Sequence, residues 1–280
     1  MLKIIIPTDF SDNAMHAANC AAGIAAKCGA VLYLVHVMDT ATDPILGAVA
    51  ADARYLERYT LEEFDRLRTV KQQMSGHHHH LTIELRLLKG MAADAVLSFC
   101  QNEQADLIVM GAHGSGRLKE VLIGSVTADV IAGSKVPVLA VPLDYQFSEP
   151  GVLLFATKRF EEDKALLNGL ITMADLFGAG IDVVSFIKKG EAAEYIDTTW
   201  HLNHYVEYLH RSFPHIEFTI HRLEGNDFQE SIDQYGRQNN IEMVALFNHP
   251  RSFVDTLCRR NKTKRAVFHS HIPVLVLPGV

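Results

Sequence analysis

The residues with the clearest chemical potential lie in one stretch, "GAHGSGRLKEVLIGSV", at positions 111–126. It contains Gly111, Gly114, Gly124 and Ser125, with two residues between the first two glycines and nine before the third. Glycine lets backbone N–H groups converge on one point because no Cβ stands in the way, and such groups bind anions. A helix that begins near Gly124 would add free N–H groups and the positive end of its dipole. The stretch therefore predicts a phosphate site.

The spacing distinguishes this stretch from two common phosphate loops. It matches neither the G-x-G-x-x-G of dinucleotide-binding domains nor the G-x-x-x-x-G-K-[ST] of the P-loop. A glycine-rich turn followed by a kinked helix is the purely structural alternative. The chain contains no Ser-His-Asp order, zinc-protease motif or kinase signature, so the sequence predicts no catalytic residue.

The first half of the chain alternates short apolar runs with helical patterns. The expected strands are Ile4–Ile6, Val31–Val37, Leu81–Leu88, Leu107–Met110 and Val138–Val141. The expected helices are Ala14–Lys27, Tyr55–Met74, Ala92–Asn102 and Val121–Ala132. Runs this apolar are typical of strands covered on both faces, and strand–helix alternation predicts a doubly wound parallel sheet with right-handed crossovers.

The second half repeats this plan. "KIIIPTDF" at residue 3 is matched by "VLLFATKR" at residue 152, and "VPVLAVP" at residue 136 by "IPVLVLP" at residue 272. The stretch "DYQFSEPG", residues 144–151, carries the acidic, proline and glycine signals of a linker. We therefore expect an α/β chain with two doubly wound, five-stranded parallel-sheet domains of the HUP or Rossmann-like type. They would span residues 1–144 and 151–280 and be related by a pseudo-twofold axis.

Two segments of the first half resemble the universal stress proteins. The spacing G-x-x-G, nine residues, then G-[ST] is similar to the nucleotide motif of that family, and the resemblance extends over 32 residues from Gly111. "PTDFS", at the end of the first expected strand, resembles the family's first block. The resemblance implies a stress-response regulatory protein that binds ATP or a related adenine nucleotide.

The resemblance also implies which residues contact the nucleotide. Pro7, Thr8 and Asp9 would line the ribose and adenine, and the Asp9 carboxylate can accept hydrogen bonds from ribose hydroxyls. The backbone of Val37 would meet the adenine. The remaining positions implied by the resemblance, most of them around the phosphates, are Met110, Gly111, His113, Gly114, Gly124, Ser125 and Val126. His113 receives no catalytic role.

The second half lacks these residues at the matching positions. In the order of the first copy, Asp9, Gly111, Gly114, Gly124 and Ser125 are replaced by Lys158, Phe247, Pro250, Arg260 and Asn261. Phenylalanine fills space that glycine leaves open, and proline removes an N–H donor. We therefore expect one nucleotide, held by the first domain, with the second domain as its pseudo-dimer partner.

The last strand of each domain would lie at a sheet edge. An exposed apolar edge strand invites aggregation, so a stable protein must cover it. By resemblance to single-domain relatives that dimerise through this strand, Val138–Val141 and Val274–Leu277 are expected to pair antiparallel within one chain. A further homodimer could form through other surfaces. We also expect a protein partner, which the sequence does not identify.

Composition excludes several classes of protein. The net charge of −7, with a single short basic patch near residue 260, argues against a nucleic-acid surface. No apolar run approaches membrane-spanning length. The four cysteines form no C-x-x-C pair, which fits reduced thiols in the cytoplasm.

Several residue clusters could bind metal but are expected not to. The tract His77–His80 is typical of a solvated loop, and the pair His201 and His204 lies on a helix whose apolar positions indicate core packing. The acidic residues Asp39, Asp43, Glu62 and Glu63 could hold magnesium beside the phosphates, but we expect them to be surface charges. Magnesium is thus a secondary candidate cofactor.

Two classes of function fit the motif. The first is a nucleotide-binding regulatory protein. The second is a weak ATPase or nucleotidyl-transferring enzyme with the same type of sheet. The sequence has a phosphate cradle but no arginine finger and no evident base for water, which favours the binding protein.

Overall fold

The computed structural model describes residues 1–38, 53–78, 80–112, 123–143, 145–190, 192–248 and 271–279. The strands are β1 (Lys3–Pro7), β2 (Val31–Met38), β3 (Thr82–Lys89), β4 (Leu107–Gly111), β5 (Val138–Val141), β6 (Val152–Ala156), β7 (Gly180–Lys188), β8 (Phe218–Gly225), β9 (Met243–Asn248) and β10 (Val274–Pro278). The helices are α1 (Asp12–Cys28), α3 (Ala53–His77), α4 (Ala92–Glu103), α5 (Ser125–Gly133), α6 (Lys164–Phe177), α7 (Ala192–Ser212) and α8 (Phe228–Gln238).

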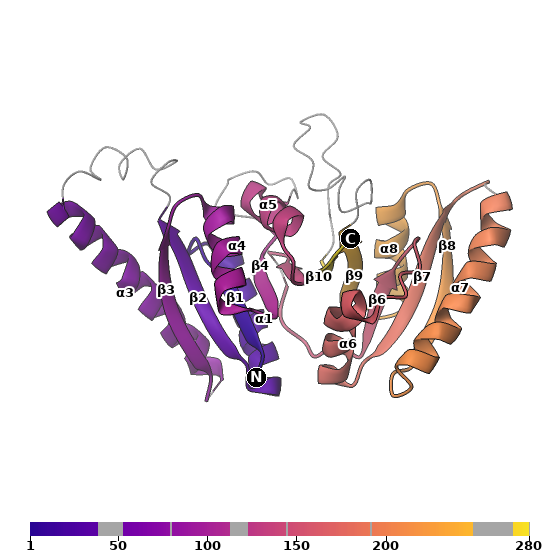
Figure 1. The fold of residues 1–280 in the computed structure, drawn as a ribbon, viewed down its shortest axis with the longest axis horizontal. Coiled ribbons are helices and arrows are strands. Elements are labelled where there is room, and N and C mark those ends of the chain that lie inside the picture. Colours follow the sequence, from indigo (N-terminus) through magenta and orange to yellow (C-terminus); the bar gives the residue numbers. More distant parts are fainter. Residues whose placement is uncertain are drawn as a thin grey trace.

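The ten strands form one sheet in the order β3-β2-β1-β4-β5-β10-β9-β6-β7-β8. Neighbouring strands are parallel within β1–β5 and within β6–β10, and the two sets, here the first half and the second half, meet at β5 and β10 (Figure 1). Each half has the order of a doubly wound sheet. The predicted α/β fold class is confirmed.

The two halves join through the strands that the sequence places at the sheet edges. β5 and β10 pair antiparallel, with Val138, Leu139 and Ala140 opposite Val276, Leu275 and Val274. The predicted antiparallel pairing is therefore confirmed. Because it lies inside one chain, each edge strand is covered and its backbone groups are paired.

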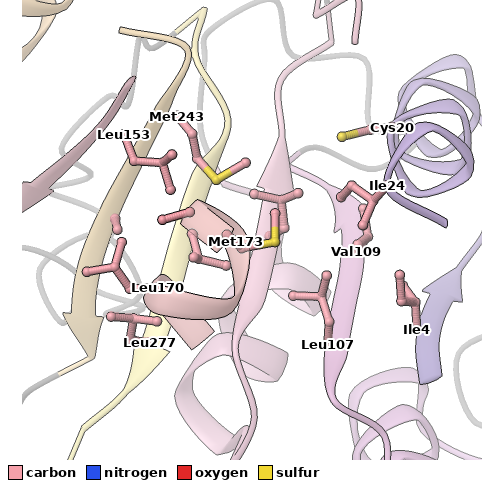
Figure 2. Close-up of a cluster of buried hydrophobic side chains, with 14 of the residues drawn as sticks. Ile4, Cys20, Ile24, Leu107, Val109, Leu153, Leu170, Met173, Met243 and Leu277 are labelled. Atoms are coloured by element: carbon pink, nitrogen blue, oxygen red, sulfur yellow. The ribbon is translucent and has the colours of Figure 1, made fainter. Parts of the chain in front are cut away.

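Helices cover both faces of the sheet. One buried cluster joins α1, α3, α6 and α7 to the sheet, and a second joins α4, α5 and α8 to the opposite face. Figure 2 shows the first cluster at the seam, where Ile4 and Leu107 of the first half share a core with Leu153 and Met173 of the second. Among the described residues, no helix is both long enough and apolar enough to cross a membrane.

The last helix of the first half starts later than the sequence pattern indicates. The expected start, Val121, lies outside the described residues, and α5 begins at Ser125. Gly124 precedes it with an extended backbone (φ −59°, ψ 149°) and provides no side chain to cap the helix. The helix therefore begins at the Gly124–Ser125 pair and is not kinked there.

Candidate functional site

Those predicted site residues that the structure describes lie near the point where the strand order reverses. β1 lies between β2 and β4, and the next described helices after β1 and β4, α1 and α5, cover opposite faces of the sheet. Ligands of open parallel sheets bind at such a point, beyond the carboxyl ends of the strands. Pro7 ends β1 and Gly111 ends β4, and the two strands are paired through Ile4 and Leu107.

The loop after β1 is held by its own hydrogen bonds. The Thr8 N–H donates to the Val35 carbonyl (2.8 Å), and the buried Thr8 hydroxyl accepts from the Phe10 N–H (3.0 Å). The exposed Asp9 carboxylate accepts from the N–H and the hydroxyl of Ser11 (3.0 and 2.6 Å). Ser11 in turn caps α1. The loop therefore presents the Asp9 carboxylate at the surface beside the start of α1.

Phe10 adopts a backbone conformation that is unusual for a residue with a side chain. Its φ is 63°, in the left-handed region, which a bulky residue occupies only where its surroundings hold it there. The Arg66 guanidinium lies 3.8 Å above the Phe10 ring, and the His36 ring is 4.5 Å away between centroids. Contacts from α3 and β2 thus stabilise the turn that follows Asp9.

The buried carboxylate of Glu63 lies between Arg66 and His36. The side chain of Glu63 is 6% exposed and accepts two hydrogen bonds from Arg66, both at 3.0 Å. Its other neighbour is His36 Nε2, at 3.5 Å, while His36 Nδ1 lies 2.8 Å from the Thr8 carbonyl. We refer to Phe10, His36, Glu63 and Arg66 as the α3 cluster.

The α3 cluster corrects the interpretation of Glu63 as a surface charge. Its neighbour Glu62 is exposed and pairs only weakly, with Arg58 at 3.6 Å, as expected. Helical periodicity could have placed Glu63 on the buried face, because Leu67 and Met74 follow it by four and eleven residues and are buried. The sequence does not show that its carboxylate lies beside the loop after β1. Sequence reasoning therefore missed the support that α3 gives to the loop after β1.

The Val37 backbone lies past the end of β1. The pairing of β1 with β2 ends at Pro7 and Val35, two residues before Val37. On its other side Val37 pairs with Leu88 of β3. Because β1 stops short, the β1-facing side of Val37 borders the same edge of the sheet as Asp9.

The other wall of the site is the start of α5. The Gly124 N–H donates to the Ala112 carbonyl (2.8 Å), and the buried Thr127 hydroxyl donates to the Gly111 carbonyl (2.8 Å). These bonds hold the first turn of α5 against the end of β4, next to Met110 and Gly111. Ser125 and Val126 are exposed there, and helix geometry leaves the N–H groups of the first turn without partners in the helix. That turn can therefore bind an anion.

Gly111 has a packing role. A Cβ at Gly111 would lie 2.8 Å from Cγ and Nδ2 of Asn13, so glycine is needed for α1 to approach β4. Among the described glycines, those with positive φ are Gly29, Gly90, Gly178 and Gly190, which include neither Gly111 nor Gly124. Close approach, rather than an unusual φ, explains the glycine at this position.

Some predicted residues lie outside the described part of the chain. They are His113, Gly114, Asp39, Asp43, His79, Pro250, Arg260 and Asn261. Within the described residues, no three His, Cys, Asp or Glu side chains gather in a way that could hold a metal ion. His201 and His204 lie on α7, where His201 stacks on Phe160 and His204 on Trp200.

The second half repeats the backbone of the site with different side chains. The Thr157 N–H donates to the Val184 carbonyl (2.9 Å), as Thr8 does to Val35 in the first half. The next residue, Lys158, is an exposed cation in the place of Asp9. At the place of Gly111, the buried Phe247 packs edge-on against Phe155, with ring centroids 5.6 Å apart.

Fold and candidate site together define a doubly wound α/β protein of two similar halves, with an exposed helix start at the end of β4 in the first half. The model of the "Universal stress protein family" matches residues 1–142, and the chain belongs to this family.

Individual relatives cover one half or both. Universal stress protein MJ0531 of Methanocaldococcus jannaschii is 34% identical over 139 residues, which is 50% of this chain and 81% of the relative. Universal stress protein Mb2346c of Mycobacterium bovis is 23% identical over 250 residues, 82% of this chain and 79% of its own length. A crystal structure of a universal stress protein from Archaeoglobus fulgidus has a TM-score of 0.72 at 18% identity and covers 99% of this chain and 96% of its own. The likeness of fold thus extends through both halves.

Proposed function

We propose that this chain is a regulatory protein of the stress response that binds one adenine nucleotide through its first half. The observation that carries the proposal is the position of two features at one edge of the sheet. The Asp9 carboxylate follows β1, and the open first turn of α5, with Ser125, is fastened to the end of the neighbouring strand β4. A nucleotide needs both: an acceptor for ribose hydroxyls and donors for phosphate oxygens.

The residues have distinct roles in this proposal. Asp9 binds the ribose hydroxyls, while Pro7, Thr8 and the backbone of Val37 border the adenine. Met110 and Gly111 form the floor between them. Phosphate oxygens accept hydrogen bonds from the segment that contains Gly124, Ser125 and Val126, and His113 and Gly114 belong to the same segment. Magnesium, where present, would bind to the phosphates themselves.

The second half keeps the fold and supplies no nucleotide site in this proposal. Lys158 and Phe247 stand where the first half has Asp9 and Gly111. The second half instead covers the β5 edge, so that the chain acts as a pseudo-dimer. A cytoplasmic location, in which the free thiols of Cys20, Cys28 and Cys100 stay reduced, is part of the proposal.

Calorimetric titration of the full chain with ATP, ADP and AMP tests the proposal. We expect one site per chain, and we expect Asp9→Asn and Ser125→Ala to weaken binding by about threefold to thirtyfold, the effect of about 0.7–2 kcal/mol for lost hydrogen bonds. Lys158→Ala is the matched control in the second half and should leave the affinity unchanged. Two equal sites, or no binding at millimolar nucleotide, would contradict the proposal.

A single-turnover assay separates binding from catalysis. We expect the bound nucleotide to be recovered intact, with and without magnesium, after an incubation much longer than the time the nucleotide takes to dissociate. Stoichiometric release of phosphate or pyrophosphate would favour the enzyme instead.

A further inference from the structure

The segment that joins the two halves is docked along α1. The carbonyl oxygen of Tyr145 lies 3.2 Å from Nδ1 of His16, and Lys27 Nζ lies 2.6 Å from a carboxylate oxygen of Glu149. These two contacts fasten residues 145–149 at points eleven residues apart on α1. The linker therefore lies along the helix, and we name the space that it occupies there the α1 groove.

Aromatic side chains of the linker fill the α1 groove. The Phe147 ring packs directly on Gly23, where an added Cβ would be 2.3 Å from the ring, and its centroid is 6.2 Å from that of Phe177. Burial raises the pKa of Tyr145, with smaller contributions from Cys20 and Glu242 nearby. Two aromatic side chains of an extended segment thus occupy the space between α1 and the second half.

The repeat of the fold gives the α1 groove a counterpart beside α6. Thr8 pairs with Val35 as Thr157 pairs with Val184, and α1 and α6 both end at a left-handed glycine, Gly29 and Gly178. These matches all differ by 149 positions. By the same difference, the positions of His16, Gly23 and Lys27 on α1 correspond to Ala165, Thr172 and Leu176 on α6.

A cavity of about 230 Å³ lies at those positions of α6. Ala165, Thr172 and Leu176 all line it, together with Met173 of the same helix and Leu107 of β4. Asp106 also lines it. In the last two strands of each half the matching positions differ by 136, as in Leu139 and Leu275, so the counterpart of Asp106 is Glu242, which accepts a hydrogen bond from Gly151. The two grooves are thus equivalent places in the two halves, and the described part of the chain places a linker in only one of them. We name this cavity the α6 groove.

We propose that the α6 groove binds an extended segment of a partner protein that inserts an aromatic side chain, as the linker does in the α1 groove. The linker shows which chemistry fits between a helix and the opposite half. The volume suits the same chemistry, since a cavity of about 150 Å³ already takes benzene. The α6 groove is also less polar than its counterpart, because Ala165 and Leu176 replace His16 and Lys27.

Two differences define the segment further. Thr172 replaces Gly23, so the ring lies nearer the mouth of the groove than Phe147 does. The exposed Lys135 lines the mouth and favours an acidic residue beside the aromatic one. The partner segment is therefore extended, with an aromatic residue flanked by an acidic one.

The linker sequence itself provides the probe. A capped peptide of residues 144–151, "DYQFSEPG", is titrated into the isotope-labelled full chain and followed by backbone amide chemical shifts. We expect saturable binding with shifts that localise to Leu2, Thr172 and Leu176. A peptide in which both aromatic residues are alanine should bind at least tenfold more weakly.

A variant at the rim tests the location. Asn168 is exposed on α6 and lines the groove, so Asn168→Trp should block the opening and weaken binding at least tenfold. The control is Asn102→Trp, an exposed asparagine on α4, which packs on the opposite face of the sheet. It should leave binding unchanged. If Asn168→Trp fails to fold, the pattern of shifts in the natural chain decides alone.

Three results would overturn the proposal. Shifts centred on Gly23 and the linker would mean that the peptide displaces the linker from the α1 groove. Equal binding of the alanine peptide would remove the aromatic side chain as the anchor. Saturable binding of octanoate at Thr172 without binding of the peptide would assign the groove to an aliphatic ligand instead.

Discussion

Leu139 of β5 lies directly opposite Leu275 of β10 in the antiparallel pair that joins the two halves. Both side chains are completely buried. Exchange of the two halves turns Leu139 into Leu275 and so maps this pair onto itself. The same exchange turns the pair of Val138 and Val276 into the pair of Val274 and Ala140. The pseudo-twofold axis therefore passes through this pair, and the first and second halves share a core there.

The shared core predicts cooperative unfolding. Leu139→Ala and Leu275→Ala should each lower the free energy of unfolding by about 2–5 kcal/mol, the range for a buried leucine. In the double variant the two losses should not add, because the residues are in contact. Leu143→Ala is the control, since that leucine is 46% exposed. Urea unfolding followed by circular dichroism measures all four variants, and two separate transitions in the natural chain would contradict a shared core.

The α3 cluster predicts a difference between two adjacent glutamates. Glu63→Gln should lower the free energy of unfolding by about 1.5–3 kcal/mol, because Glu63 is buried and its charge accepts two hydrogen bonds from Arg66. Glu62→Gln should change it by less than about 0.5 kcal/mol. Hydrogen exchange adds a local measure: the Phe10 and Ser11 amides should exchange faster in Glu63→Gln only. Equal effects of the two substitutions would show that the buried carboxylate gives the loop no support.

The close approach of α1 to β4 predicts an effect of one added methyl group. Gly111→Ala should destabilise the chain by about 1–3 kcal/mol, because the new Cβ meets Asn13 at 2.8 Å inside a packed core. Gly76→Ala on α3 is the control, since a Cβ there meets nothing within 4 Å. It should leave stability unchanged or raise it by up to about 1 kcal/mol. Thermal unfolding of both variants decides, and a neutral Gly111→Ala would mean that α1 shifts freely.

Buried thiols predict a pattern of chemical modification. Burial raises the pKa of Cys20 to about 12 and, with Asp106 nearby, that of Cys100 to about 11. Both therefore remain thiols at pH 8 and should resist iodoacetamide until the chain unfolds, whereas the half-buried Cys28 should react in the folded protein. Peptide mass spectrometry before and after denaturation measures this. Rapid modification of Cys20 in the folded chain would contradict its burial.

The same two pKa values predict how stability depends on pH. The folded protein keeps these thiol protons more tightly than the unfolded chain, whose thiols ionise near their ordinary value of 9.0. The stabilisation is therefore complete below about pH 9 and is lost as the pH rises towards 11 and 12. Cys20→Ala should reduce this alkaline loss of stability in urea titrations between pH 8 and 10.

Local pattern was sufficient to predict the elements and their order. Apolar runs such as Leu107–Met110 have too few polar positions for a sheet with one solvent-exposed face. They therefore predict a parallel sheet that helices cover on both faces. The similarity of "VPVLAVP" and "IPVLVLP" indicated two equivalent edge strands, and their pairing follows from the cost of leaving either exposed. The spacing of Gly111, Gly124 and Ser125 located the candidate site in the first half.

Contacts between distant segments could be found only in the folded structure. The periodicity of α3 places Glu63 on its buried face, but only the packing of α3 against the sheet shows that its partner there is His36. Gly23 and Thr172 occupy equivalent helix positions, yet one is covered by Phe147 and the other lines a cavity. Periodicity along the chain specifies which elements form and which of their faces are apolar. It does not specify which distant side chain fills each gap, because that depends on how the two halves and their linker pack together.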